Sequence, residues 1–280
     1  MSRLVAVPNV SEGRDEAVLD AIGAAFARHA DVLHRSADVY HHRAVFFLAG
    51  APGELHLALA AGAAEAAERI DLRTHDGLHP RVGALDVAPV VFLEPGRRGA
   101  AIAEALLAAD AIGVAGIPVF LYGELAGGRT RAELRAGGPQ GLQARGIRPD
   151  YGPPGPHPSA GATLVAARPP LIAFNLELEP PATLEDARRV AARIREGGEE
   201  GLAGVRALGL ELARRDVIQV STNIEDHRAT TATAVLEAVA RHHAVARAEL
   251  VAPAPEAALA AWPEDVDLRM PGTIEALLGR

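Results

Sequence analysis

Two short polar segments combine histidines with carboxylates and arginines, the side chains that suit acid–base chemistry near neutral pH. The first contains Asp38, His41, His42 and Arg43 between two apolar runs. The second, Thr74–Arg81, has histidines at positions 75 and 79. Since histidine is the side chain that titrates closest to neutrality, both segments are candidates for proton transfer.

The second segment is predicted to be a loop. Histidines four residues apart share one face of a helix and could bind a metal ion there. However, Gly77 between them and Pro80 after them disfavour a helix. Pro80 also favours extended backbone at His79. His79, next to Arg81, therefore either faces a cleft as an acid–base group or is an ordinary solvated loop histidine.

The first segment has three interpretations. A carboxylate such as Asp38 could orient a histidine and stabilise its protonated form, as the third member of a catalytic triad does. The same residues also suit a polar hairpin. The third interpretation is a His/Asp metal cluster with His41, His42, His75 and His79, although the spacing matches no specific metal motif.

Composition removes several other kinds of chemistry. The 280 residues contain no cysteine, and all 28 Lys or Arg side chains are arginines. This excludes thiolate nucleophiles, cysteine-based metal sites and catalytic lysines. With a formal net charge of −8, the chain lacks the excess of basic residues that is typical of nucleic-acid-binding proteins. With neither a signal segment nor an apolar run of ~18 residues, we expect a cytoplasmic protein that does not bind membranes.

Alternating apolar and alanine-rich runs predict alternating strands and helices. In the first half, strands are predicted at 4–10, 32–33, 44–48, 85–93 and 117–121, and helices at 15–29, 53–70 and 99–112. The pattern restarts after Arg168, with strands at 171–176, 205–210, 217–220 and 246–251, and helices at 184–195, 230–242 and 273–278.

The order in the second half is β-α-β-β-α-β, the split ferredoxin-like arrangement. We therefore predict an α+β fold of two related subdomains, residues 1–167 and 168–280. Residues 127–161 are dense in glycine and proline. This tract is either a flexible linker or a stiff, preset loop that frames a ligand. A further polar turn is predicted at Gln219–Asp226, after a strand.

Seven segments in chain order resemble the glutamate formimidoyltransferases, that is, the formiminotransferase domain of histidine degradation. They are Val7–Gly13, His79–Val87, Ile117–Glu124, Pro149–Pro153, Gly161–Thr163, Leu171–Leu176 and Gln219–Asn223. The resemblance spans nearly the whole chain, but has no counterpart of the cyclodeaminase domain that is fused to the animal enzymes. We expect a separate enzyme to process the product.

The resemblance implies two subdomains whose sheets face each other, with helices outside and folate in a tunnel between them. It implies transfer of a formimidoyl group from N-formimidoyl-L-glutamate to N5 of tetrahydrofolate, a step of one-carbon metabolism. Tetrahydrofolate would be a co-substrate, no metal is expected, and the protein would be a homodimer.

By the same resemblance, the catalytic histidine of the His-Pro-Arg motif falls on His79. The folate-contacting loop falls on Gly152, Pro153, Pro154, Gly155, Pro156, His157, Pro158, Ser159, Ala160 and Gly161. One histidine near neutral pKa can act first as general base and then as general acid. Our own hypotheses are that Asp38 supports the imidazolium, and that Arg43 or Arg81 binds a substrate carboxylate.

The chain departs from the family pattern at four positions. Where members commonly have His-Lys-Gly-Glu-His-Pro-Arg, this chain has Asp76 and Leu78 in place of the lysine and the glutamate. His42 replaces the asparagine of an Asn-Arg pair, and His227 replaces a late aromatic residue. The alternative function is therefore a folate-binding member with a different formimidoyl donor or without turnover.

Overall fold

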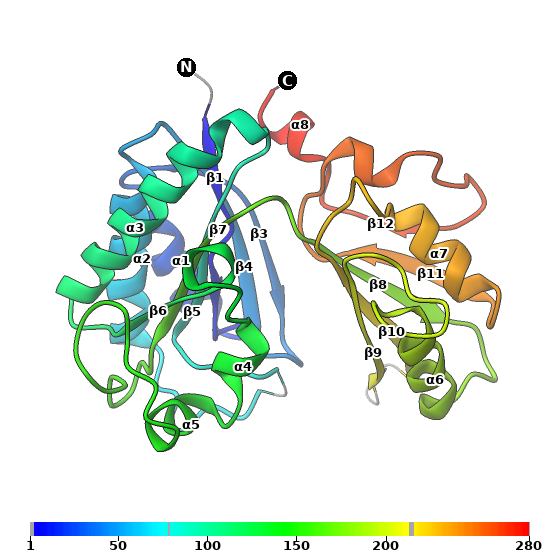
Figure 1. Cartoon of the computed structure of the whole chain (residues 1–280), viewed down its shortest axis with the longest axis horizontal. Helices are drawn as coiled ribbons and strands as arrows, with labels where there is room; N and C mark the ends of the chain where they lie inside the picture. Colours follow the sequence, from blue (N-terminus) through cyan, green and yellow to red (C-terminus); the bar gives the residue numbers. More distant parts are fainter. Residues whose placement is uncertain (1–2, 78, 213–215, 280) are drawn as a thin grey trace. The chain divides into compact units, whose positions relative to one another are not determined.

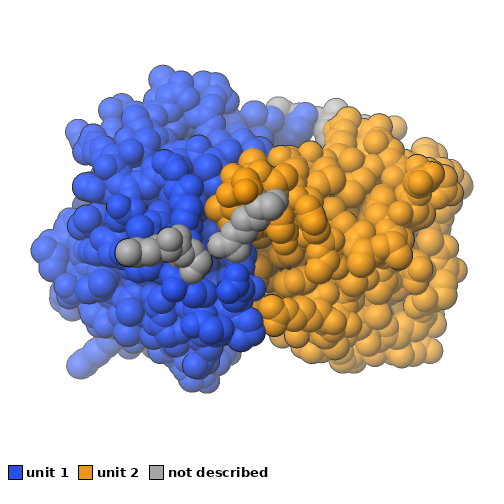
Figure 2. Space-filling model, turned by 90° about the horizontal axis from the view of Figure 1, so that it is seen from above, with its two compact units in different colours: residues 1–168 blue, residues 169–280 orange. Residues whose placement is uncertain are grey.

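The chain forms two compact units, residues 1–168 and residues 169–280 (Figure 2). The computed structural model describes residues 3–77, 79–212 and 216–279, so Leu78 lies outside the described residues. Each unit has its own sheet and its own apolar core. The protein is therefore an α+β protein of two units.

The first unit contains one mixed sheet. Its strands are β1 (Leu4–Ala6), β2 (Asn9–Val10), β3 (Asp31–Asp38), β4 (Arg43–Gly50), β5 (Leu85–Val91), β6 (Val119–Leu121) and β7 (Thr163–Arg168). Its helices are α1 (Glu16–Phe26), α2 (Leu55–Arg69), α3 (Arg98–Val114), α4 (Arg131–Arg135) and α5 (Gly138–Ala144). Across the sheet the order is β3, β4, β1 with β2, β5, β7, β6, and only the β5–β7 and β7–β6 pairs are parallel.

Helices α1, α2 and α3 cover one face of this sheet (Figure 1). Asp15 begins α1 by accepting hydrogen bonds from the backbone N–H groups of Ala17 and Val18. A Cβ atom on Gly62 of α2 would lie 2.0 Å from the Phe26 ring of α1, so this close approach requires glycine.

The predicted first strand is interrupted at Pro8, which separates β1 from β2. Proline has no N–H to donate, but its carbonyl still accepts a hydrogen bond from the Phe46 N–H at 2.9 Å. Strands β3 and β4 are longer than predicted and form a hairpin whose register pairs Asp38 with Arg43. The first polar segment is thus the end of a hairpin.

Strand β7 is absent from the predicted elements. It lies between β5 and β6 in the parallel part of the sheet. It is only six residues long and follows the glycine- and proline-rich tract, and its partners are distant in sequence. A short apolar run of this kind carries no periodicity that identifies a strand.

The tract 127–161 is part of the first unit, because β7 follows it in the same sheet. It is therefore not a linker between the units. It contains α4 and α5, and a capping box between Thr130 and Glu133 begins α4. The Arg145 guanidinium closes the other end of α4 by donating to the carbonyls of Glu133 at 2.6 Å and Ala136 at 2.9 Å.

The second unit has one sheet with two helices, α6 and α7, on one face (Figure 1). Its elements are β8 (Ile172–Leu178), α6 (Leu184–Ile194), β9 (Val205–Leu212), β10 (Val217–Ile224), α7 (Ala232–Ala240), β11 (Val245–Leu250), β12 (Leu268–Arg269) and α8 (Ile274–Leu277). The strand order is β12, β11, β8, β10, β9, with only β11 and β12 parallel.

The turn predicted at Gln219–Asp226 is largely strand. Strand β10 continues to Ile224, because Ser221, Thr222 and Asn223 pair with β8 on one side and β9 on the other. Across the described residues, helices long and apolar enough to cross a membrane are absent.

Candidate active site

His79 lies in the loop between α2 and β5, and its ring contacts the backbone of the next residue, Pro80. Its Nδ1 atom is 2.7 Å from the Pro80 carbonyl oxygen. A carbonyl oxygen only accepts hydrogen bonds, whereas the Arg43 guanidinium, 3.3 Å from the same nitrogen, only donates them. The shorter contact to Pro80 favours the tautomer with the hydrogen on Nδ1 and the lone pair on Nε2. The neutral ring therefore has its basic nitrogen at Nε2.

A buried ion cluster lies against this ring. Arg43, the first residue of β4, places Nη1 2.8 Å from Asp86 Oδ2 and 3.3 Å from His79 Nδ1. The Arg43 Nε–H also donates to Asn9 Oδ1 at 3.0 Å. The fully buried Asp86 of β5 accepts a second ion-pair hydrogen bond, from Arg135 at the end of α4. Its other oxygen accepts from the Val82 N–H at 2.8 Å.

This cluster sets the charge of His79. Burial lowers the pKa of His79 to about 3, and the positive charges of Arg43 and Arg135 act in the same direction. Burial alone would raise the pKa of Asp86, but the two arginines outweigh it and hold that pKa well below its usual range. At neutral pH, His79 is therefore uncharged, but its pKa is well below the near-neutral value that we expected, so its imidazolium is costly to form without a compensating negative charge.

Asp38 pairs with His41. Its Oδ1 atom accepts the backbone N–H groups of Tyr40 and His41, both at 2.8 Å, and its Oδ2 atom lies 2.8 Å from His41 Nδ1. This hydrogen bond raises the pKa of His41, against the opposing effect of burial. The His41 ring lies edge-on to that of His79, with centroids 6.2 Å apart. Asp38 is thus hydrogen-bonded to His41, whose ring in turn lies against His79.

His42 and His75 form a second histidine pair. Their rings stack with centroids 4.2 Å apart and an interplanar angle of 25°. His42 Nδ1 accepts the Gly13 N–H at 3.1 Å, and His75 Nδ1 accepts the Gly77 N–H at the same distance. Burial lowers the pKa of both rings. The pair therefore joins the two polar segments as neutral rings.

The four loop histidines are brought together, but as two separate pairs. Within residues 3–77, 79–212 and 216–279, no group of three or more His, Cys, Asp or Glu side chains is placed to hold a metal ion. Asp76, one of the departures from the family pattern, is exposed and pairs with Arg14 at 2.6 Å. His227, another departure, is buried within the second unit.

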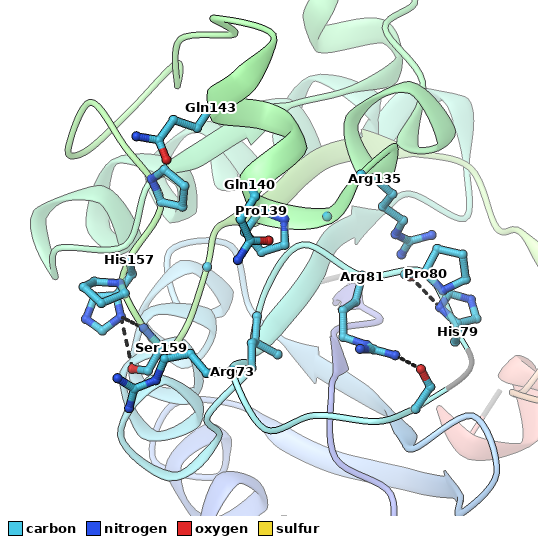
Figure 3. A pocket seen from close by; sticks show the side chains of 17 residues that line it. Arg73, His79, Pro80, Arg81, Arg135, Pro139, Gln140, Gln143, His157 and Ser159 are labelled. Atoms are coloured by element: carbon cyan, nitrogen blue, oxygen red, sulfur yellow. Dashed lines mark hydrogen bonds between the residues drawn. The ribbon is translucent and has the colours of Figure 1, made fainter.

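A cavity of about 610 Å³ opens beside His79 (Figure 3). Three segments line it: the loop after α2, the α4–α5 region and the proline-rich loop that ends at Gly161. Its lining residues are Leu72, Arg73, Gly77, His79, Pro80, Arg81, Arg135, Gly137, Gly138, Pro139, Gln140, Gln143, Pro156, His157, Pro158, Ser159 and Gly161. Five of the ten predicted folate-loop residues are thus in the lining, whereas Gly152–Gly155 and Ala160 are not.

The proline-rich loop is locked to the His79 loop. The Ala162 N–H donates to the Val82 carbonyl at 2.8 Å, and the Leu72 N–H donates to the Ser159 carbonyl at 2.8 Å. Gly161 has φ +70°, and a Cβ atom there would lie 2.0 Å from the Val82 oxygen. The contact requires glycine, so the two loops form one preset wall of the cavity.

Arg43 and Arg81, which we predicted to bind a substrate carboxylate, differ in their hydrogen bonds and in their access to the cavity. The Arg43 guanidinium is already bonded to Asp86 and Asn9. Arg81 lines the cavity and donates to the Gly77 carbonyl (Figure 3).

Sequence reasoning missed Asp86 and Arg135. A charged residue inside the apolar run of β5 was a signal for Asp86, since unpaired carboxylates are rarely fully buried. Arg135, in a five-residue helix, had no such local signal.

Two models of known protein families match most of the chain. Residues 3–168 match the model of the formiminotransferase domain, N-terminal subdomain, and residues 173–259 match the model of the formiminotransferase domain. The chain belongs to the formiminotransferase family.

Its relatives in this family include single and fused proteins. Glutamate formimidoyltransferase of Streptococcus pyogenes serotype M1 is 35% identical over 235 residues, covering 80% of this chain and 78% of the relative. That of Thermoplasma acidophilum is 33% identical over 242 residues, covering 82% and 79%. Formimidoyltransferase-cyclodeaminase of Rattus norvegicus is 37% identical over 261 residues, covering 86% and 47%. The formiminotransferase-family chain thus spans about half the length of the fused relatives.

Proposed function

We propose that the protein transfers a formimidoyl group from N-formimidoyl-L-glutamate to N5 of tetrahydrofolate, giving 5-formimidoyltetrahydrofolate and glutamate. The observation that carries the proposal is the uncharged His79 at the edge of the 610 Å³ cavity, whose Nε2 has no hydrogen-bond partner among the described residues. The family membership and the names of the two glutamate formimidoyltransferases support it.

In the proposed mechanism, N5 attacks the formimidoyl carbon and His79 Nε2 takes the proton that N5 loses. This forms a tetrahedral intermediate. The His79 imidazolium then returns the proton to the glutamate nitrogen as its bond to the formimidoyl carbon breaks. Holding both substrates in one cavity supplies much of the remaining rate enhancement.

Asp38 would support this proton transfer indirectly. Its hydrogen bond to His41 raises the pKa of that ring and fixes its orientation, and the His41 ring is edge-on to His79. His41 and His79 thus keep different proton affinities, with His79 as the base. We propose that Asp38 is a positioning residue that acts through His41.

Tetrahydrofolate would bind as co-substrate against the 152–161 loop, with Pro156, His157 and Ser159 facing the cavity. Proline and glycine offer flat apolar surface and few competing backbone donors to a pteridine ring. For the substrate carboxylates, Arg81 is the better of the two arginines that we predicted, because it lines the cavity. We propose that the reaction needs no metal and that the protein is a homodimer.

The two units would descend from one ferredoxin-like ancestor. Both contain a β-α-β-β-α-β succession, and both sheets begin with the same order: β3, β4, β1 with β2, β5 in the first and β9, β10, β8, β11 in the second. This shared order supports the proposed duplication. Each sheet then continues with a parallel strand, β7 beside β5 and β12 beside β11, so β6 is the strand of the first sheet that lacks a counterpart among the described residues.

The test compares wild type with His79→Ala, and with His29→Ala as a control because His29 is exposed in the turn that follows α1. We expect transfer from N-formimidoyl-L-glutamate by wild type and His29→Ala, and loss of transfer in His79→Ala with tetrahydrofolate binding retained. Tetrahydrofolate binding by wild type without transfer would instead favour the alternative function. Assays with N-formimidoyl-L-aspartate and N-formimidoylglycine would then distinguish a different donor from a member without turnover.

A further inference from the structure

One carboxylate holds two arginines beside the cavity. Asp86 is fully buried, and its Oδ2 atom receives Arg43 from β4 and Arg135 from α4. A buried carboxylate with one partner is already neutralised, so the second guanidinium adds a positive charge that Asp86 does not balance. The cluster of Asp86, Arg43 and Arg135 therefore has one uncompensated positive charge.

Arg81 increases this excess. It lies in the same cavity lining as Arg135, and it donates hydrogen bonds to the carbonyls of His75 and Gly77. Of the described residues, Asp86 is the carboxylate hydrogen-bonded to this group of three arginines. Because His79 is uncharged, and Asp76, the other carboxylate that acts on Arg81, is exposed and paired with Arg14, the region favours a ligand of negative charge.

The Arg135 guanidinium is only partly hydrogen-bonded. Its side chain is only 13% exposed, and one guanidinium nitrogen is bonded to Asp86. Its Nε–H is buried without a hydrogen-bond partner among the described residues. Arg135 and His79 lie near each other along one side of the cavity (Figure 3). Since the guanidinium makes one side-chain hydrogen bond, to Asp86, and the residue lines the cavity, it keeps donor capacity for a ligand there.

The helix that carries Arg135 is fixed at both ends. Thr130 and Glu133 cap its start, and Arg145 binds the carbonyls on either side of Arg135. Gly137 follows with φ +76°, which turns the chain sharply into α5. The guanidinium is therefore held in place before any ligand binds.

We propose that Arg135, held in place by Asp86, binds a carboxylate group of the formimidoyl donor next to His79. This rests on the proposed function. The carboxylate balances the positive charge that Asp86 leaves uncompensated on Arg43 and Arg135. It also reduces the cost of forming the His79 imidazolium during transfer, because that cost comes partly from Arg43 and Arg135. Binding of the donor and activation of the acid–base residue are thus coupled.

The kinetic test uses Arg135→Gln and Arg135→Lys, with Arg148→Gln as control because Arg148 is exposed outside the cavity lining. We expect Arg135→Gln to raise the KM for the donor about tenfold to a hundredfold, the range of a lost charge-assisted hydrogen bond. Arg135→Lys should fall in between, while the KM for tetrahydrofolate changes little. A wild-type donor KM in Arg135→Gln would overturn the proposal.

A second measurement does not depend on turnover. L-Glutamate is titrated into wild type, Arg135→Gln and Arg148→Gln while the His79 ring is followed by NMR across a pH series. We expect L-glutamate to raise the pKa of His79 in wild type and Arg148→Gln, but not in Arg135→Gln. No shift in wild type, or an equal shift in Arg135→Gln, overturns the proposal. A shift that needs Arg135 without any formimidoyl transfer would leave this site intact and reject the transferase activity.

Whether Asp86 is a positioning residue is tested by comparing how its substitution changes the KM values of the two substrates. Asp86→Asn should raise the donor KM more than the tetrahydrofolate KM, and Asp86→Glu should restore part of the difference. A purely structural Asp86 would affect both substrates equally, through loss of folded protein.

Discussion

The imidazole of His79 lies edge-on to that of His41, with ring centroids 6.2 Å apart, and the two rings have opposite electrostatic surroundings. Burial and two arginines lower the pKa of His79, whereas Asp38 raises that of His41. Neighbouring groups with diverging pKa values are typical of acid–base sites.

The low pKa of His79 predicts how stability depends on pH. Since the unfolded histidine binds a proton near pH 6.5 and the folded one near pH 3, stability from this residue is present above pH 6.5 and is lost as pH falls towards 3. We expect His79→Gln to flatten the fall in the unfolding free energy between pH 6.5 and 3, measured by urea denaturation. An unchanged slope would contradict the assignment.

Asp38→Asn should lower the pKa of His41, because the hydrogen bond to Asp38 is the main cause of its rise. NMR titration of the His41 ring measures this directly. We also expect a smaller fall in kcat than in His79→Ala, since Asp38 contacts His41 rather than His79. Asp31→Asn serves as control, because Asp31 is an exposed residue at the other end of β3 that pairs with Arg3. Equal losses in Asp38→Asn and Asp31→Asn would show that the effect is not specific to His41.

Gly161→Ala should destabilise the protein and loosen the cavity wall. Its φ is +70° and the new methyl group would overlap the Val82 carbonyl, so we expect a loss of about 2–4 kcal/mol. Gly155→Ala in the same loop is the control, because nothing lies within 4 Å of its Cβ position and its φ is not positive. Denaturation midpoints compare the two, and a similar change in both would be evidence against the locked loop.

Two helix glycines should respond in opposite directions. Gly62→Ala places a methyl group against the Phe26 ring and should cost about 1–3 kcal/mol. Gly99→Ala, at the start of α3, meets open space and should stabilise by about 0.5–1 kcal/mol, because alanine loses less backbone entropy than glycine. Thermal unfolding of both variants checks the signs.

Much of the element order was predictable from local pattern. Apolar periodicity located α1, α2, α3, α6 and α7 and most strands, because one helix face or strand face must be buried whatever it packs against. Gly77 and Pro80 likewise indicated a loop at His79 without any knowledge of the fold.

Other features depended on residues far apart in the chain. Strand β7 has too few residues to be periodic and is defined by its pairing with β5 and β6. Asp86 and Arg135 are 49 positions apart and meet only because α4 packs near β5. The partner of Asp38 also became clear only once the hairpin had placed His41 within hydrogen-bond distance.

By itself, the sequence determined the succession of elements, the loop that carries His79 and the residue types available for chemistry. These follow from local backbone preferences and from the burial of one face of each element. Only the tertiary structure decided which charges meet. The strength of a charge–charge interaction, and the burial that lowers the pKa of His79, depend on distances across the sheet that sequence spacing does not encode.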